Sequence, residues 1–429
     1  MQREIINPLA TSKILYVFAS WGVIMEIAMD SLCFMFSKAF DMIEEEYTGA
    51  SEYHSLRVAS LCAKMGKCVG IEDDSLLALS TCALFHDNAL TEYSLIQGES
   101  IYSSIDLRPH CECGQRNVEW LPFAKSVDGY ILHHHSCENG KGPFGVSEFP
   151  SEAAFIGAAD ISDFTYHLQR VPAGELNIVR DKIAARIGTF STKSAIETLL
   201  AVLDNEMLES LRDENIHETV QKLLPAWKTR VEDTTVFRLA RFIAHIIDCK
   251  SKYTRKHSEQ ISNRAWVMSS SYGYSREEMV QLYLSASLHD IGKIAIPSVT
   301  LEKAGKLTDD EYRLIMEHVR HTYDWLGEVE GLGKIRTWAS EHHEKLDGSG
   351  YPFGKRDTEL EFNSRLLSCI DIYQAVCEER PYHSARSHED TMPILCKMAE
   401  NGYIDGKIVD DLDKVMAEYS LRDLPSPTG

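Results

Sequence analysis

The chain is short of basic residues, and this shortage limits the ligands it can bind. Its 429 residues include 44 Lys and Arg against 65 Asp and Glu, a formal net charge of -21 at pH 7. Such a charge repels phosphate polymers and argues against non-specific binding to DNA or RNA. An anionic ligand would need a local metal or a local basic cluster, so a small phosphorylated ligand held by metals fits the composition.

A regular cysteine framework and a long uninterrupted apolar run are also missing. The eleven cysteines have no regular spacing, and several lie in apolar helical contexts, where a reduced thiol packs as a small hydrophobe. We therefore expect a reducing, cytoplasmic location. Glu26 and Asp30 interrupt the apolar run at residues 14–36, and no basic segment with a cleavage site precedes it. We interpret this run as a buried helix or a homodimer seam, and expect no membrane partner.

Low-complexity tracts are absent, and strand-like alternation is nearly so. The length allows two or three domains, each with its own core. Residues 76–85 and 280–288 are largely apolar runs, and residues 308–326 carry apolar side chains at three- and four-residue steps, which indicates helix. The charge run at residues 44–46 is interpreted as a solvated helix face. These patterns predict an all-α protein.

An internal repeat of polar residues divides the chain. From His54 to His86 and from His257 to His289 there are 32 residues in each case, and 24 separate His110 from His134 and His318 from His342. We predict two tandem helical bundles, residues 1–190 and 239–425, joined by a helical linker at residues 191–238. Each copy holds seven candidate metal ligands: His54, His86, Asp87, His110, His134, His135 and Asp160 in the first, and His257, His289, Asp290, His318, His342, His343 and Asp371 in the second.

These residue types are suited to two divalent transition-metal ions. Imidazole and carboxylate ligands accept Fe, Mn, Ni or Zn, and the carboxylate of a His-Asp pair can bridge two ions held by histidines of other helices. Two ions about 3.5–4 Å apart can lower the pKa of a bridging water and clamp both the attacking and the leaving oxygens of a phosphodiester. The C-terminal copy therefore predicts hydrolysis by a metal-bridging hydroxide, without a covalent intermediate.

Further residues of the C-terminal copy fit a phosphorylated substrate. Lys293 follows Asp290 by three residues, so its ammonium can reach a phosphate or leaving oxygen. The loop at residues 346–354 is rich in glycine, which lets the backbone approach a ligand closely. Within it, Gly350 precedes Tyr351, a stacking ring, and Pro352, which stiffens the turn. Arg365 could fork onto a second phosphate.

Three motifs carry a resemblance to a known family. HDIGKIAIP from His289, HHEKLDGSGYP from His342 and ERPY from Glu379 resemble the HD-GYP family of HD-domain metal phosphohydrolases, over nearly the whole C-terminal half. The resemblance implies hydrolysis of cyclic di-GMP or cyclic GMP-AMP to linear dinucleotide or mononucleotides. It implies that the seven C-terminal residues are metal ligands and Lys293 the catalytic lysine. Tyr253 stands where three-metal members have Glu, which favours two metals.

The N-terminal copy departs from the family pattern. It keeps all seven candidate ligands, but Leu90 replaces the lysine, Ala154 replaces the arginine, and its glycine-rich turn lacks the tyrosine. The resemblance implies a degenerate domain with a candidate second metal site that senses, binds or scaffolds, with a phosphatase or nucleotidase activity as the weaker alternative. A structural zinc site of His110 with Cys111, Cys113 and Cys137 is another alternative.

Two other functions stay open for the whole chain. One is a cyclic dinucleotide receptor or signalling scaffold with little turnover, with a signalling partner bound through the N-terminal domain. The other is hydrolysis of an ordinary nucleotide, as in other HD phosphohydrolases, although the GSGYP turn argues against it. The intact C-terminal ligand set and Lys293 favour the cyclic dinucleotide phosphodiesterase.

Overall fold

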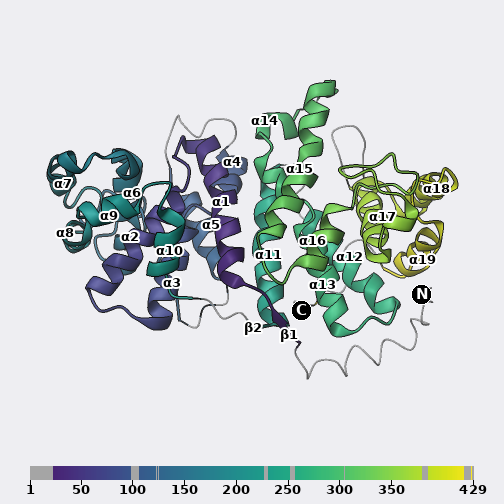
Figure 1. Ribbon diagram of the computed structural model, residues 1–429, viewed down its shortest axis with the longest axis horizontal. Helices are drawn as coiled ribbons and strands as arrows, with labels where there is room; N and C mark the ends of the chain where they lie inside the picture. Colours follow the sequence, from purple (N-terminus) through teal and green to yellow (C-terminus); the bar gives the residue numbers. More distant parts are fainter. Residues whose placement is uncertain are drawn as a thin grey trace. The chain divides into compact units, whose positions relative to one another are not determined.

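Helices dominate the computed structural model, which confirms the all-α prediction (Figure 1). The structure describes residues 23–97, 106–121, 123, 125–226, 230–251, 257–303, 305–378, 385–419 and 427. Within these ranges no helix combines the length and the apolar character that crossing a membrane requires. The chain divides into two compact units, with the division inside helix α1, after Ser31.

The N-terminal unit, Leu32–Lys228, is a helical bundle around α2. Helix α2 packs against α3, α6, α8 and α10, and most of its residues are buried. The helices are α1 (Met29–Thr48), α2 (His54–Cys68), α3 (Asp73–Leu84), α4 (Leu90–Gln97), α5 (Arg108–Val118), α6 (Ser151–Tyr166), α7 (Leu176–Ala184), α8 (Lys193–Val202), α9 (Asn205–Ser210) and α10 (Ile216–Leu223).

The C-terminal unit contains residues 23–31 and the described residues from 230 onward. Helix α13 packs against α11, α12 and α16, while α17 packs against α12, α16, α18 and α19. The elements are β1 (Ile24–Glu26), β2 (Arg230–Glu232), α11 (Asp233–Cys249), α12 (His257–Ser271), α13 (Arg276–Leu288), the 3-10 helix η5 (Ile291–Ala295), α14 (Ser298–Leu301), α15 (Asp309–Gly327), α16 (Gly333–Ser340), α17 (Phe362–Cys377), α18 (His388–Glu400) and α19 (Gly406–Met416).

Capping boxes fix the start of the two helices that lead into the C-terminal histidines. Ser275 caps α13 reciprocally with Glu278, and Thr308 caps α15 with Glu311. Each cap satisfies backbone N–H groups that the first turn leaves without partners, and is worth about 1 kcal/mol. The first cap fixes the start of α13, whose last residue directly precedes His289. The second cap fixes the start of α15, which contains His318.

Two interpretations of the sequence are wrong. Residues 14–36 do not form one helix: β1 pairs antiparallel with β2, Met25 opposite Val231, and α1 begins only at Met29. Residues 14–22 lie outside the described part. Residues 44–46 do not form one solvated face, because Glu44 is buried while its two neighbours are exposed. Helices α8 to α10 lie in the N-terminal unit, and the domain boundaries at 190/191 and 238/239 stay predictions.

Gly292 allows η5 to lie against α15. A Cβ at this position would come within 1.9 Å of the carbonyl oxygen of His318, and the amide N–H of Gly292 donates to Oγ1 of Thr322 at 3.1 Å. We expect Gly292→Ala to lower the free energy of unfolding by about 1–3 kcal/mol, since backbone must move to admit the methyl group. Urea denaturation beside Gly333→Ala, which meets nothing within 4 Å, tests this; equal stability of the two variants would contradict it.

Candidate metal centres and active site

The seven predicted ligands of the C-terminal unit converge on one cluster. They come from the start of α12, the end of α13, the middle of α15, the turn after α16 and the middle of α17. The ligand atoms form two groups, and within each group they lie within 4.8 Å of one another. One group is His257, His289 and Asp371, and the other is His318, His342 and His343. All except His343 are buried.

Asp290 lies between these two groups and turns one oxygen toward each. Its Oδ2 is 3.2 Å from Nε2 of His289 and 3.9 Å from Nε2 of His257. Its Oδ1 is 3.3 Å from Nε2 of His318 and 3.9 Å from Nε2 of His342. This is the arrangement that a carboxylate bridging two metal ions requires.

Hydrogen bonds on the outer ring nitrogens aim the imidazoles inward. In His289, His318 and His342, Nδ1 lies 2.7, 2.6 and 2.6 Å from a carbonyl oxygen three residues earlier in the chain. Nδ1 therefore donates, so that in the neutral imidazole Nε2 is the nitrogen without a proton and is directed at the cluster, as in metal-binding histidines generally. His257 is held by a carboxylate instead, 2.8 Å from Nδ1 to Glu378.

The inward atoms of the cluster fit metal ions. Nε2 of His289, His318 and His342 and Oδ1 of Asp290 are buried and form no hydrogen bond of acceptable geometry, although an oxygen of Asp290 lies 3.2, 3.3 and 3.9 Å from the three nitrogens. Leaving such an atom unsatisfied costs about 1–3 kcal/mol, so these inward atoms are a poor arrangement for a packed core. Nitrogen and carboxylate donors in this number suit Fe, Mn, Ni or Zn.

The electrostatics of the cluster favour bound cations. Burial lowers the pKa of His343 to about 3 and holds the pKa of His342 well below its ordinary value, so both imidazoles are neutral donors. Burial opposes charge on His257, but hydrogen bonds with Asp371 and Glu378 raise its pKa to about 9. A proton therefore competes with a metal ion at His257, and metal affinity should fall as pH falls.

Glu378 positions His257, so removing its charge should weaken metal binding. We expect Glu378→Gln to lower metal affinity by about 10–100-fold, the usual cost of losing an outer-shell partner. Competition with a chromophoric chelator measures this. Glu389→Gln on α18 is the matched control, since Glu389 is exposed. Equal affinities for Glu378→Gln and the control would contradict the role.

Lys293 and Tyr351 both lie beside the cluster. Lys293 forms an ion pair with Oδ2 of Asp290 while its side chain stays 19% exposed. The ring of Tyr351 lies against His343, with centroids 4.8 Å apart. Gly350 is required here, because a Cβ would come within 2.6 Å of His343 oxygen and closer still to the backbone of Glu344 and Lys345.

The glycine-rich turn is organised by Glu344, which sequence reasoning did not single out. Its buried carboxylate accepts hydrogen bonds from the amides of Phe353, Gly354 and Lys355 at 2.6, 3.2 and 2.9 Å. The amide of Tyr351 in turn bonds to the carbonyl of His343 at 3.3 Å. The turn is therefore tied directly to the histidine pair.

A pocket beside this turn adds residues that the sequence did not indicate. Tyr351 and Pro352 line it together with Met316, Glu317 and Arg320 of α15. Arg320 follows His318 by two residues in α15, a spacing that gives no signal because such residues do not share a helix face. Arg365 lies elsewhere, where its Nη1 pairs with Asp405 at 2.7 Å and lines a separate small cavity with Glu344 and Tyr403. Its contact with phosphate stays a prediction.

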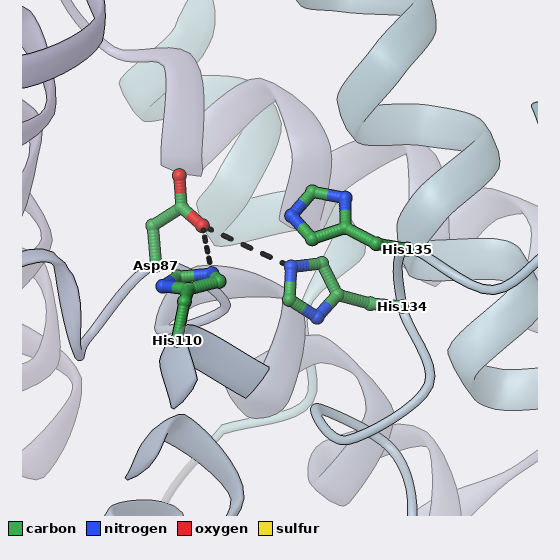
Figure 2. A group of neighbouring side chains, drawn as sticks. All are labelled: Asp87, His110, His134 and His135. Carbon is green, nitrogen blue, oxygen red and sulfur yellow. Dashed lines mark ion pairs between the residues drawn. The ribbon is translucent and has the colours of Figure 1, made fainter. Parts of the chain in front are cut away.

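The N-terminal unit also gathers its seven candidate ligands. Figure 2 shows Asp87 with His110, His134 and His135, a group whose ligand atoms lie within 4.8 Å of one another. Oδ1 of Asp87 is 3.1 Å from Nε2 of His110 and 3.9 Å from Nε2 of His134, while its Oδ2 is 3.7 Å from Nε2 of His86. His54 and Asp160 complete the set, with Nε2 of His54 3.3 Å from Oδ1 of Asp160.

Three other points of the sequence analysis have different outcomes. His110 joins the other histidines, and the thiol of Cys137 donates to Asn139 at 3.0 Å, which favours the repeat over a structural zinc site. Leu90, at the position of Lys293, is buried. Tyr253 and residues 379–382, which carry the ERPY motif, lie outside the described residues.

A carboxylate of a His-Asp pair set between two groups of inward histidines defines the HD-domain class of proteins. In agreement, a family model described as HD domain matches residues 241–408, which include all seven C-terminal ligands. Enzymes of this class depend on metal ions.

Relatives narrow the class. The chain is 30% identical over 317 residues to 3'3'-cGAMP-specific phosphodiesterase 3 of Vibrio cholerae, covering 72% of this chain and 67% of that one. It is 26% identical over 392 residues to phosphodiesterase 1 of that series, covering 87% and 90%. The cyclic di-GMP phosphodiesterase response regulator RpfG of Xanthomonas campestris is 32% identical over 202 residues, covering 45% and 51%.

A solved structure shares the fold. The crystal structure of a cyclic GMP-AMP specific phosphodiesterase of V. cholerae superposes with a TM-score of 0.60, at 20% identity, over 92% of this chain and 99% of that one. The chain belongs to the HD-GYP family of cyclic dinucleotide phosphodiesterases.

Proposed function

We propose that the C-terminal unit hydrolyses a cyclic dinucleotide, cyclic di-GMP or 3'3'-cyclic GMP-AMP, to the linear dinucleotide or to mononucleotides. The observation that carries the proposal is the position of Asp290, with one oxygen toward each histidine group and Lys293 beside it. The relatives are named as phosphodiesterases of these two nucleotides, which supports the substrate class.

Two divalent ions complete this site. His257, His289 and Asp371 would hold one, His318, His342 and His343 the other, and Asp290 would bridge them. Bound there, Fe, Mn, Ni or Zn would supply an activated water and neutralise charge on the phosphate.

The protein's own groups orient the substrate around that centre. Lys293 places a positive charge beside Asp290, where it stabilises the charge that grows on phosphate or leaving oxygens. Tyr351 offers a ring beside His343 for stacking against a base, and Gly350 and Pro352 shape the turn that holds it. Arg320, 53% exposed in the adjoining pocket, is placed for a second phosphate.

A domain assignment accompanies this activity. We propose residues 239–425 as the catalytic domain and residues 1–190 as a regulatory domain. The loss of the lysine and tyrosine from the N-terminal copy supports this division. Cytoplasmic location and a homodimer or signalling partner through the N-terminal domain remain part of the proposal.

The test is a substrate panel followed by chromatography of the products. Purified protein of known metal content is incubated with cyclic di-GMP, cyclic GMP-AMP and a nucleoside monophosphate, with added Mn or Fe(II). Metal-dependent cleavage of a cyclic dinucleotide is the expected result. Binding without cleavage under every metal would instead support a receptor, and cleavage of the monophosphate alone an ordinary nucleotide phosphohydrolase.

A further inference from the structure

The N-terminal cluster includes the carboxylate of Glu44, which has no counterpart in the C-terminal unit. Two matching contacts show this. Asp41 of α1 accepts the amide N–H of Ser55 at 2.9 Å, as Asp248 of α11 accepts that of Ser258 at 3.0 Å. These two contacts show that Asp41 and Asp248 are equivalent positions in the two units, because Ser55 and Ser258 each follow the first ligand histidine. Glu44 then stands three residues after Asp41, where the C-terminal unit has Ser251.

Glu44 is buried and directed at the histidines. It is 2% exposed, and its Oε1 lies 3.4 Å from Nε2 of His54. Glu44, His54 and His86 place ligand atoms within 4.8 Å of one another. Oε2 of Glu44 and Nε2 of His86 are both buried without a hydrogen-bond partner. A buried carboxylate needs a cation, several donors or a proton; burial raises the pKa of Glu44 to about 8, and neither of its oxygens has several donors here.

The other group of this cluster, Asp87 with His110, His134 and His135, also has buried nitrogen atoms directed inward. Nε2 of His110 and of His134 are buried and form no hydrogen bond of acceptable geometry, although Oδ1 of Asp87 lies 3.1 and 3.9 Å from them. Asp87 lies between these histidines and His86 and divides its oxygens as Asp290 does. His110 and His134 lie on one oxygen (Figure 2), and His86 lies on the other. The N-terminal unit therefore has two positions for cations, with Asp87 between them.

The support behind the first ligand histidine is also kept, but by other residues. Nδ1 of His54 lies 2.7 Å from Oδ2 of Asp163, and Nε of the buried Arg57 donates to the same carboxylate at 2.9 Å. In the C-terminal unit Glu378 does this, seven residues after Asp371, whereas Asp163 follows Asp160 by three. Rebuilding the support at a different position fits a histidine that still binds metal.

We propose that the N-terminal unit holds its own pair of divalent transition-metal ions, and that Glu44 is a ligand to one of them. A protein carboxylate at that ion takes a coordination position that a catalytic site leaves to water or substrate. With the buried Leu90 where the other unit has Lys293, this centre serves to hold metal firmly.

Metal content of the full-length chain tests the proposal. The C-terminal centre is first removed by His289→Ala with Asp290→Ala, and the protein is loaded with Mn or Zn, desalted and analysed by mass spectrometry for metal per chain. This background should retain about two ions, as two-metal sites do. Adding Glu44→Gln should remove about one of them, while Glu45→Gln, at the exposed neighbour, should remove none.

Two results would overturn the proposal. One is a folded background, by circular dichroism, that retains no metal; the other is Glu44→Gln that retains as much metal as Glu45→Gln. If Glu44→Gln does not fold, Glu44→Asp replaces it, since the shorter side chain withdraws the carboxylate but keeps its charge. The same loss of metal is then expected, and full retention overturns the role of Glu44.

Discussion

Lys293→Met is expected to lower kcat for cyclic dinucleotide hydrolysis by about 10²–10³-fold, the usual cost of removing one preorganised group that stabilises transition-state charge. Lys293 is the cation paired with Asp290 in the C-terminal centre, and part of its side chain is open to a ligand. Methionine keeps the approximate length of the side chain and removes only the ammonium group. Because Lys293 would not ligate the ions, metal content should stay the same.

Steady-state kinetics with metal analysis of the same samples measure this effect. Lys303→Met is the matched control, because Lys303 pairs with Glu311 at 2.6 Å away from the cluster. Wild-type kcat in Lys293→Met would contradict a catalytic role. A parallel loss of metal and activity would instead make Lys293 a residue that supports Asp290.

Asp290→Asn is expected to cause the second large effect, the loss of both bound metal and activity. The side chain of Asn has one oxygen and one NH₂ group, so it cannot offer an oxygen ligand to the ion at each of the two histidine groups. Metal affinity should fall by more than the ~10–100-fold that an outer-shell substitution costs, with hydrolysis falling to background.

The comparison for this variant is Asp310→Asn, whose carboxylate is 90% exposed and pairs with Arg313. Titration with Mn while product formation is followed gives both quantities in one series. If Asp290→Asn bound metal and turned over substrate like Asp310→Asn, Asp290 would not be the bridging ligand.

Much of this site was predictable from the repeat and the family motifs. The intervals from His54 to His86 and from His110 to His134 recur unchanged in the second copy, and they single out the same residue types without knowledge of the packing. The structure brings together all seven of these residues in each unit. The glycine turn was predictable for a similar reason, since only glycine permits the close approach at Gly350.

Residues whose role depends on tertiary packing were not predictable. Glu44 belongs to a run of three glutamates, and only tertiary contacts of α1, such as that of Asp41 with Ser55 of α2, decide which of them is buried. Glu378 and Asp163 do the same work at different offsets, so no shared spacing indicates them. The strand at residues 24–26 forms because β2, more than 200 residues away, supplies its partner.

The most direct measurement compares two full-length variants, each lacking one centre. His86→Ala with Asp87→Ala disables the N-terminal centre, and His289→Ala with Asp290→Ala disables the C-terminal one. Initial rates of cyclic dinucleotide cleavage are measured with both proteins loaded with the same metal. The first variant should cleave the substrate and the second should not. Cleavage by the second variant, with none by the first, would place the activity in the N-terminal unit and contradict the assignment.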